Sequence, residues 1–154
     1  MNTYQRIFGT GPRGLLLSII MLGAAWGLEK TYGFGQIHGF SALGWGALMT
    51  GGAVTIVILF WAVKSLPVAK RGNKLVTTGA FRYFRHPLYA AFLLGAGPGL
   101  VIYLDGWPYL AVGFSAFPLW HWNVRGEEAM MASIFPDDYP AYCQKTGRFF
   151  PKLW

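Results

Sequence analysis

Charged side chains suited to binding a polar ligand occur in two short stretches of this sequence. The first is Arg85-His86-Pro87, and the second contains Glu127. Proline favours the first turn of a helix, where unpaired backbone amides attract anions, so Arg85 and His86 are predicted to stand beside an anion site. A carboxylate such as Glu127 is suited to binding a cation. We therefore predict a single pocket with an anion-binding and a cation-binding side.

The surroundings of Glu127 follow from helical spacing. Asn123 lies four residues earlier, on the same predicted helix face, whereas Glu128 points about 100° away from that face. The spacing leaves an alternative open. In it, Arg85 and His86 contact lipid phosphates, and Glu127 only pairs with a neighbouring base.

The composition is that of a membrane protein. Apolar residues make up 54% of the chain and charged residues 12%, with a mean hydropathy of +0.37, whereas roughly a quarter of an ordinary soluble domain is charged. The net charge of +7 is spread over too much apolar sequence for a nucleic-acid-binding patch, so no nucleic acid is expected as a partner. A single cysteine excludes an internal disulfide. No set of ligands suited to a metal ion is visible, so no metal is predicted.

Four apolar stretches predict an all-α polytopic membrane protein that forms one domain over residues 1–154. The predicted transmembrane helices cover residues 14–34, 40–63, 87–104 and 107–124. The loop 64–86 and a short helical tail, 125–154, are polar and basic. Small residues in the stretch Gly95–Gly99 predict close helix packing within the third span.

The basic residues predict the orientation of the bundle. With four crossings, all of the 13 Lys and Arg residues except Lys30 fall on one side of the membrane. Basic residues favour the cytoplasmic side, so both termini and the loop 64–86 are predicted to be cytoplasmic.

Two motifs carry a resemblance to a known family. Residues 75–89, Leu-Val-Thr-Thr-Gly-Ala-Phe-Arg-Tyr-Phe-Arg-His-Pro-Leu-Tyr, resemble the signature of the isoprenylcysteine carboxyl methyltransferases and their bacterial relatives. The glutamate pair 127–128, followed by Phe135-Pro-Asp-Asp-Tyr139, Tyr142 and Pro151, resembles the carboxyl-terminal half of the same family. Phospholipid N-methyltransferases share the paired glutamates and a related His/Asn-Pro-x-Tyr corner. The resemblance covers about residues 64–154.

The resemblance implies a small helical membrane domain that binds S-adenosyl-L-methionine at the cytoplasmic face, in a bacterial inner membrane. We predict catalytic roles for Arg85, His86, Asn123 and Glu127. The residues that the resemblance implies for cofactor binding are Lys74, Leu75, Val76, Phe81, His86, Pro87, Leu88, Tyr89, Glu127 and Glu128.

Two positions depart from the carboxyl methyltransferase pattern. Phe81 stands where a tyrosine is usual, and Asn123 stands where that family carries an arginine that holds a substrate carboxylate. The uncharged Asn123 favours a neutral or amine acceptor over a carboxylate.

We therefore expect methyl transfer from S-adenosyl-L-methionine to a lipid or other hydrophobic acceptor that enters from the bilayer, with membrane lipids as partners. Two alternatives stay open at this point. One is an NADPH-dependent membrane reductase of the related sterol-reductase fold, and the other is a non-catalytic membrane interaction protein.

Overall fold

The computed structural model describes residues 9–33, 37, 41–66 and 74–152. Within these ranges the chain is helical and contains no strand; a single isolated bridge joins Phe84 to Gly147. The long helices are α2 (Gly11–Tyr32), α3 (Ser41–Ser65) and α6 (Trp107–Asn123). The shorter elements are η2 (Gly79–Arg82), α4 (Pro87–Ala91), η3 (Phe92–Ala96), α5 (Gly97–Leu104), α7 (Arg125–Ile134) and α8 (Asp138–Lys145).

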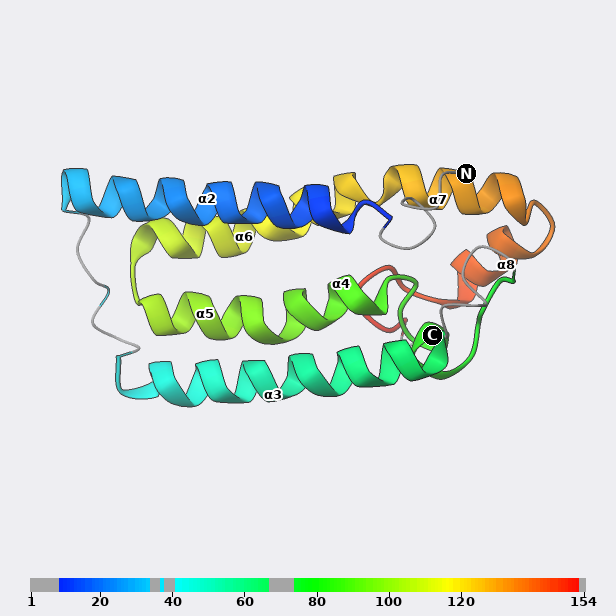
Figure 1. Ribbon diagram of the computed structural model, residues 1–154, viewed down its shortest axis with the longest axis horizontal. Helices are drawn as coiled ribbons and strands as arrows, with labels where there is room; N and C mark the ends of the chain where they lie inside the picture. Colours follow the sequence, from blue (N-terminus) through cyan, green and yellow to red (C-terminus); the bar gives the residue numbers. More distant parts are fainter. Residues whose placement is uncertain (1–8, 34–36, 38–40, 67–73, 153–154) are drawn as a thin grey trace.

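The helices form an elongated bundle (Figure 1). Helix α2 packs along α6, and α3 packs along α4, η3 and α5. Asp105 adopts a left-handed conformation with φ of 47° and ends α5, so that α6 can begin at Trp107 and run back beside it. Helices α7 and α8 lie at the end of the bundle where α4 begins. We call this end, which carries α7, α8 and the start of α4, the polar end.

Three helices in the described part of the chain are long and apolar enough to cross a membrane. They cover Gly11–Tyr32, Leu43–Ser65 and Pro87–Leu104. The fourth predicted span forms a helix, α6, at the predicted place, but it contains only 17 residues. At 1.5 Å per residue it is about 26 Å long, somewhat less than the roughly 30 Å of a bilayer core. The prediction of an all-helical membrane protein is confirmed, whereas four clear spans are not obtained.

Glycines allow α3 to approach the third span closely. A Cβ on Gly51 of α3 would lie 2.5 Å from the carbonyl oxygen of Gly95, and one on Gly99 would lie 2.6 Å from that of Ala47. Thr55 strengthens the contact, because its hydroxyl donates to the Ala91 carbonyl oxygen at 3.0 Å and accepts from the Ala96 amide at 2.7 Å. These bonds stabilise η3, a π-helical turn whose regular backbone bonding is interrupted. Close helix packing through small residues is thus confirmed.

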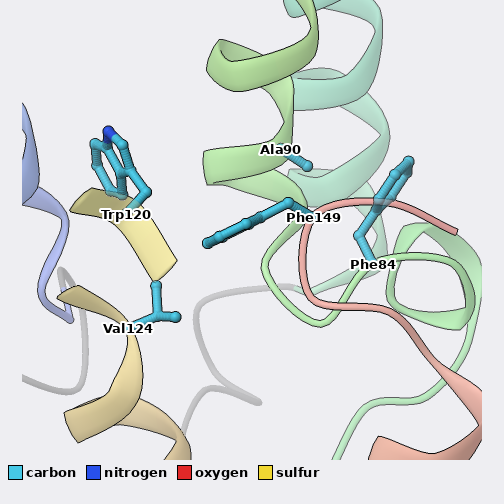
Figure 2. Close-up of a cluster of buried hydrophobic side chains, with 5 residues drawn as sticks. All are labelled: Phe84, Ala90, Trp120, Val124 and Phe149. Atoms are coloured by element: carbon cyan, nitrogen blue, oxygen red, sulfur yellow. The ribbon is translucent and has the colours of Figure 1, made fainter. Parts of the chain in front are cut away.

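The buried core lies near the polar end. Its members are Phe84, Ala90, Trp120, Val124 and Phe149 (Figure 2). Phe149 comes from the tail and is only 1% exposed. Burying an aromatic side chain of this size contributes about 1.5–3 kcal/mol. The tail is therefore part of the folded core.

Candidate functional site

The tail after α8 binds along the turn that precedes α4. The Arg85 amide donates to the Gly147 carbonyl oxygen at 2.8 Å, and the His86 amide donates to that of Arg148 at 3.2 Å. The Tyr142 hydroxyl donates to the Phe81 carbonyl oxygen at 2.6 Å. We call this set of contacts between residues 81–86 and 142–148 the clasp. It fixes the backbone that carries Arg85 and His86.

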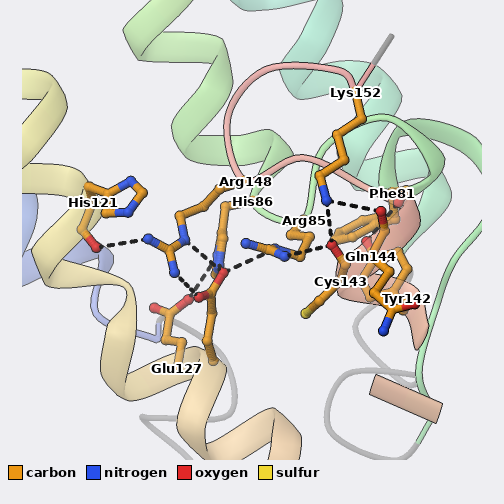
Figure 3. A network of polar contacts seen from close by, with 11 residues as sticks. Phe81, Arg85, His86, His121, Glu127, Tyr142, Cys143, Gln144, Arg148 and Lys152 are labelled. Carbon is orange, nitrogen blue, oxygen red and sulfur yellow. Dashed lines mark hydrogen bonds and ion pairs between the residues drawn. The ribbon is translucent and has the colours of Figure 1, made fainter. Parts of the chain in front are cut away.

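Glu128 lies at the centre of an ion-pair cluster with Arg85 and Arg148. Figure 3 labels these two arginines and His86 beside them. Arg148 binds it through two nitrogens, with Nε donating to Oε1 at 2.9 Å and Nη2 donating to Oε2. Arg85 Nε lies 3.1 Å from Oε1 as an ion pair, and Arg85 Nη1 donates to the Cys143 carbonyl oxygen at 3.2 Å. These three side chains are only 13–18% exposed. The negative charge of Glu128 is thus neutralised within the protein by two arginines.

Glu127, the residue before Glu128, has four polar groups around its carboxylate. Its Oε1 receives the Tyr89 hydroxyl at 2.8 Å, the Thr10 hydroxyl at 2.7 Å and the Thr10 backbone amide. Its Oε2 lies 3.3 Å from His86 Nδ1. Because the other ring nitrogen of His86 lies 3.3 Å from Glu128 Oε1, one imidazole bridges the two glutamates. Glu128 therefore shares His86 with Glu127, although consecutive side chains leave a helix about 100° apart.

At this bridge the protein stabilises both the protonated form of His86 and the ionised forms of the two glutamates. Burial opposes the imidazolium, but hydrogen bonds to Glu127 and Glu128 outweigh it and raise the pKa of His86 above 6.5. Burial also opposes the Glu128 carboxylate, yet hydrogen bonds from His86 and Arg148 lower the pKa of Glu128 to about 2. The pKa of Glu127 is lowered in the same way, against its burial, by His86 and Thr10. With His86 protonated, three cations therefore face two carboxylates.

Asn123 lies beside Glu127, as the helical spacing predicts. Its Nδ2 donates to the Thr10 carbonyl oxygen at 3.0 Å and to the Thr10 hydroxyl oxygen at 3.2 Å. Its Oδ1 is buried and accepts no hydrogen bond from any residue that the structure describes. A buried acceptor without a donor is costly, and it is suited to receive an N–H or O–H group.

Other predicted cofactor residues lie in a different place. Lys74, Leu75 and Val76 line a cavity of about 240 Å³, together with Thr77, Thr78 and Ser65 at the end of α3. None of the glutamate cluster lines this cavity. The cavity lining is connected to Arg85 by residues 79–84, which include the 3-10 turn η2. Pro87 is buried at the first turn of α4, as predicted, and Phe81 is half-buried within the clasp.

The structure thus brings Arg85, His86, Tyr89, Asn123, Glu127 and Glu128 together. Sequence reasoning missed Thr10 and counted Arg148 only among the basic residues of the tail. Thr10 lies between Gly9 and Gly11 and is followed by Pro12, a pattern that indicates a turn. No local pattern, however, shows which distant carboxylate such a turn reaches. The same is true of Arg148, which lies 20 residues beyond Glu128.

A comparison with known protein families matches the middle of this chain, which contains most of the site residues. Residues 45–133 match the sequence model of the isoprenylcysteine carboxyl methyltransferase (ICMT) family, which is more than half of the chain. Residues 85–89, 123, 127 and 128 all fall inside the matched range, whereas Thr10 and Arg148 fall outside it.

Two curated relatives are bacterial proteins. The cobalt-zinc-cadmium resistance protein CzcN of Cupriavidus metallidurans is 39% identical over 85 residues, which are 54% of this chain and 38% of that protein. The nickel-cobalt-cadmium resistance protein NccN of Alcaligenes xylosoxydans xylosoxydans is 33% identical over 85 residues, 54% of this chain and 39% of that protein. The matched part thus spans about two fifths of each relative's own length. No solved structure matches this chain.

Proposed function

Because this chain belongs to the isoprenylcysteine carboxyl methyltransferase family, we propose that it uses S-adenosyl-L-methionine to methylate a lipid or another hydrophobic acceptor at the membrane surface. The observation that carries the proposal is the gathering of Arg85, His86, Tyr89 and Glu127 at the polar end of an apolar bundle. All four lie in the part of the chain that matches the family.

The residue types at the polar end fit the polar groups of this cofactor. A largely buried carboxylate, Glu127, is suited to an ammonium group. The cations Arg85, His86 and Arg148 outnumber the two glutamates, which leaves positive charge for a carboxylate. The cavity lined by residues 74–78 has room for a flat ring system, about 240 Å³. When bound, the cofactor supplies a methyl group activated by a sulfonium.

In methyl transfer from a sulfonium, the protein mainly has to align the methyl donor with the acceptor and to exclude water. The clasp holds Arg85 and His86 rigidly through backbone hydrogen bonds. The exposed fraction of the His86 side chain is only 9%, so charges here interact more strongly than in water. Asn123 Oδ1 is buried and accepts no hydrogen bond within the described part of the chain, which supports a methyl acceptor with an N–H or O–H group over a carboxylate.

The four-span topology belongs to the same proposal. Helix α6 starts beside the end of α5 and ends at the polar end, where Trp120 of α6 belongs to the same buried cluster as Phe84. The clasp also holds the tail against the turn before α4. Both contacts support a crossing by α6. The basic residues favour a cytoplasmic position for the site and for both termini, and we propose a bacterial inner membrane as the location.

Calorimetric titration with S-adenosylhomocysteine tests the proposal. This ligand keeps the ammonium and carboxylate of the donor. A charge-assisted hydrogen bond is worth roughly 1.5–3 kcal/mol, so Glu127→Gln is expected to weaken binding by about one to two powers of ten. The matched control is Glu29→Gln. Glu29 lies near the far end of α2, about 27 Å from its start, and accepts a hydrogen bond from Tyr109. Its replacement should leave the affinity unchanged.

Three results would contradict parts of the proposal. Equal affinity of native and Glu127→Gln protein would remove Glu127 from the site. Binding of NADPH in place of S-adenosylhomocysteine would favour the reductase, and binding of neither would favour an interaction protein. Incubating the purified protein with labelled donor and a membrane lipid extract then identifies the acceptor by the lipid that gains label.

A further inference from the structure

The turn at residues 9–11, which we call the amino-terminal turn, lies directly on two residues of the candidate site. Thr10 donates its hydroxyl and its backbone amide to Glu127 Oε1. The same threonine accepts two hydrogen bonds from Asn123 Nδ2, one through its carbonyl oxygen at 3.0 Å and one through its hydroxyl oxygen at 3.2 Å. Thr10 alone thus forms hydrogen bonds with the Glu127 carboxylate and with the Asn123 side-chain amide.

Glycines make this close approach possible. Gly9 has a φ of 56°, which disfavours any side chain, and a Cβ there would collide with Glu127 Oε1. A Cβ on Gly11 would lie 3.3 Å from the Tyr89 ring, and one on Gly14 would lie 2.6 Å from the Trp120 ring. Arg13 adds a cation–π contact, 4.5 Å from the centre of the Trp122 ring. The docking surface is therefore built by several independent contacts.

The chemistry of the contact resembles that of an ammonium ligand. An ammonium offers several N–H donors to a carboxylate oxygen. Thr10 offers an N–H and an O–H to one oxygen of Glu127, and Tyr89 supplies a third donor to the same oxygen. A carboxylate oxygen bonded in this way has no lone pair left for a further donor. Ligand and turn must therefore exclude each other at Oε1.

We propose that the amino-terminal turn is an intramolecular plug that occupies the ammonium position at Glu127 and must withdraw before the methyl donor binds. This inference rests on the proposed function. It concerns a segment outside residues 45–133, the range that matches the family. The apparent dissociation constant is then the intrinsic constant divided by the fraction of molecules with the plug open. Weakening the plug should tighten binding.

Two variants weaken the plug in different ways. Thr10→Val keeps the shape but removes the hydroxyl bond, and Gly9→Val forces a side chain against Glu127. The expected result is S-adenosylhomocysteine binding that is roughly tenfold tighter for Thr10→Val, and at least as tight for Gly9→Val. The matched control is Gly23→Val, at a helical position in α2 where an added Cβ meets nothing within 4 Å. Its affinity should equal that of the native protein.

Amide hydrogen exchange provides a second readout that does not depend on methylation. The Thr10 amide is held by Glu127, so adding S-adenosylhomocysteine to the native protein should speed exchange in the peptide that contains Thr10. Slower exchange would mean that the turn closes over the ligand as a lid, and unchanged exchange would mean that it stays in place. Either result would overturn the plug.

The outcomes separate this inference from the proposed function. If native protein and both plug variants bind S-adenosylhomocysteine with equal affinity, or the variants bind more weakly while folded, the plug is wrong and methyl donor binding stands. If neither the native protein nor any variant binds S-adenosylhomocysteine, both the plug and the proposed function are wrong.

Discussion

At the scale of single residues, one imidazole connects the two glutamates of the site. His86 lies 3.3 Å from Glu127 Oε2 through Nδ1 and 3.3 Å from Glu128 Oε1 through Nε2. The two carboxylates nevertheless have different surroundings. Glu128 is bonded to two arginines, whereas Glu127 is bonded to uncharged groups besides His86. We therefore assign stability mainly to Glu128 and ligand binding to Glu127.

Replacing Glu128 should test this division. Glu128→Gln leaves Arg85 and Arg148 without their partner in a site that is mostly buried. Breaking a buried ion pair from one side is strongly destabilising, so we expect a loss of about 3 kcal/mol in the free energy of unfolding. The measurement is an unfolding titration in mixed micelles, with Asp138→Asn at an exposed position as the control. A loss no larger than that of the control would show that the arginines find other partners.

The same carboxylate predicts a dependence on pH. The pKa of Glu128 is about 2 in the folded protein against an ordinary value of 4.5, so its contribution is complete above pH 4.5 and is lost as the pH falls towards 2. His86 acts in the opposite direction. Its pKa is raised, so its contribution is present below pH 6.5 and is lost at higher pH, above the folded value. We expect the acid loss of stability to be smaller in Glu128→Gln; an identical acid slope would contradict the assignment.

At the scale of helices, glycines allow α3 and the third span to approach each other closely. A Cβ on Gly51 would meet backbone atoms of Gly95 and Gly99, which cannot rotate away. Gly51→Ala is therefore expected to separate the helices and lower the unfolding free energy by about 1–3 kcal/mol. The neighbouring Gly52 faces open space, so Gly52→Ala serves as the control and should be neutral or slightly stabilising. Equal thermal unfolding midpoints for the two variants would contradict this contact.

The elements also show how far the sequence alone could lead. Apolar runs and Pro87 predicted the helices and the turn at the start of α4 correctly, because these depend on neighbouring residues. Helical spacing likewise placed Asn123 beside Glu127. The contacts of Thr10 with Glu127 and of Arg148 with Glu128 join residues 117 and 20 positions apart. They depend on how whole helices pack, which no local pattern encodes.

At the scale of the whole molecule, the main prediction concerns topology. If α6 crosses the membrane, a reporter fused after Trp154 and one inserted at Gly33 must report opposite sides. The 12 basic residues on one side of a four-span arrangement, with only Lys30 opposite, favour a cytoplasmic Trp154. Paired cytoplasmic and periplasmic reporters measure this directly. Both positions on the same side would limit the chain to the three clear spans.

The contacts of the tail with the polar end also determine the order in which the molecule can be completed during synthesis. Chains are made from the amino end at about 5–20 residues per second. Arg148 lies 20 residues after Glu128, so roughly one to four seconds pass before this glutamate has its bidentate partner. Phe149, which completes the buried core, follows immediately. The helices of the bundle are therefore all made before the residues that lock the polar end.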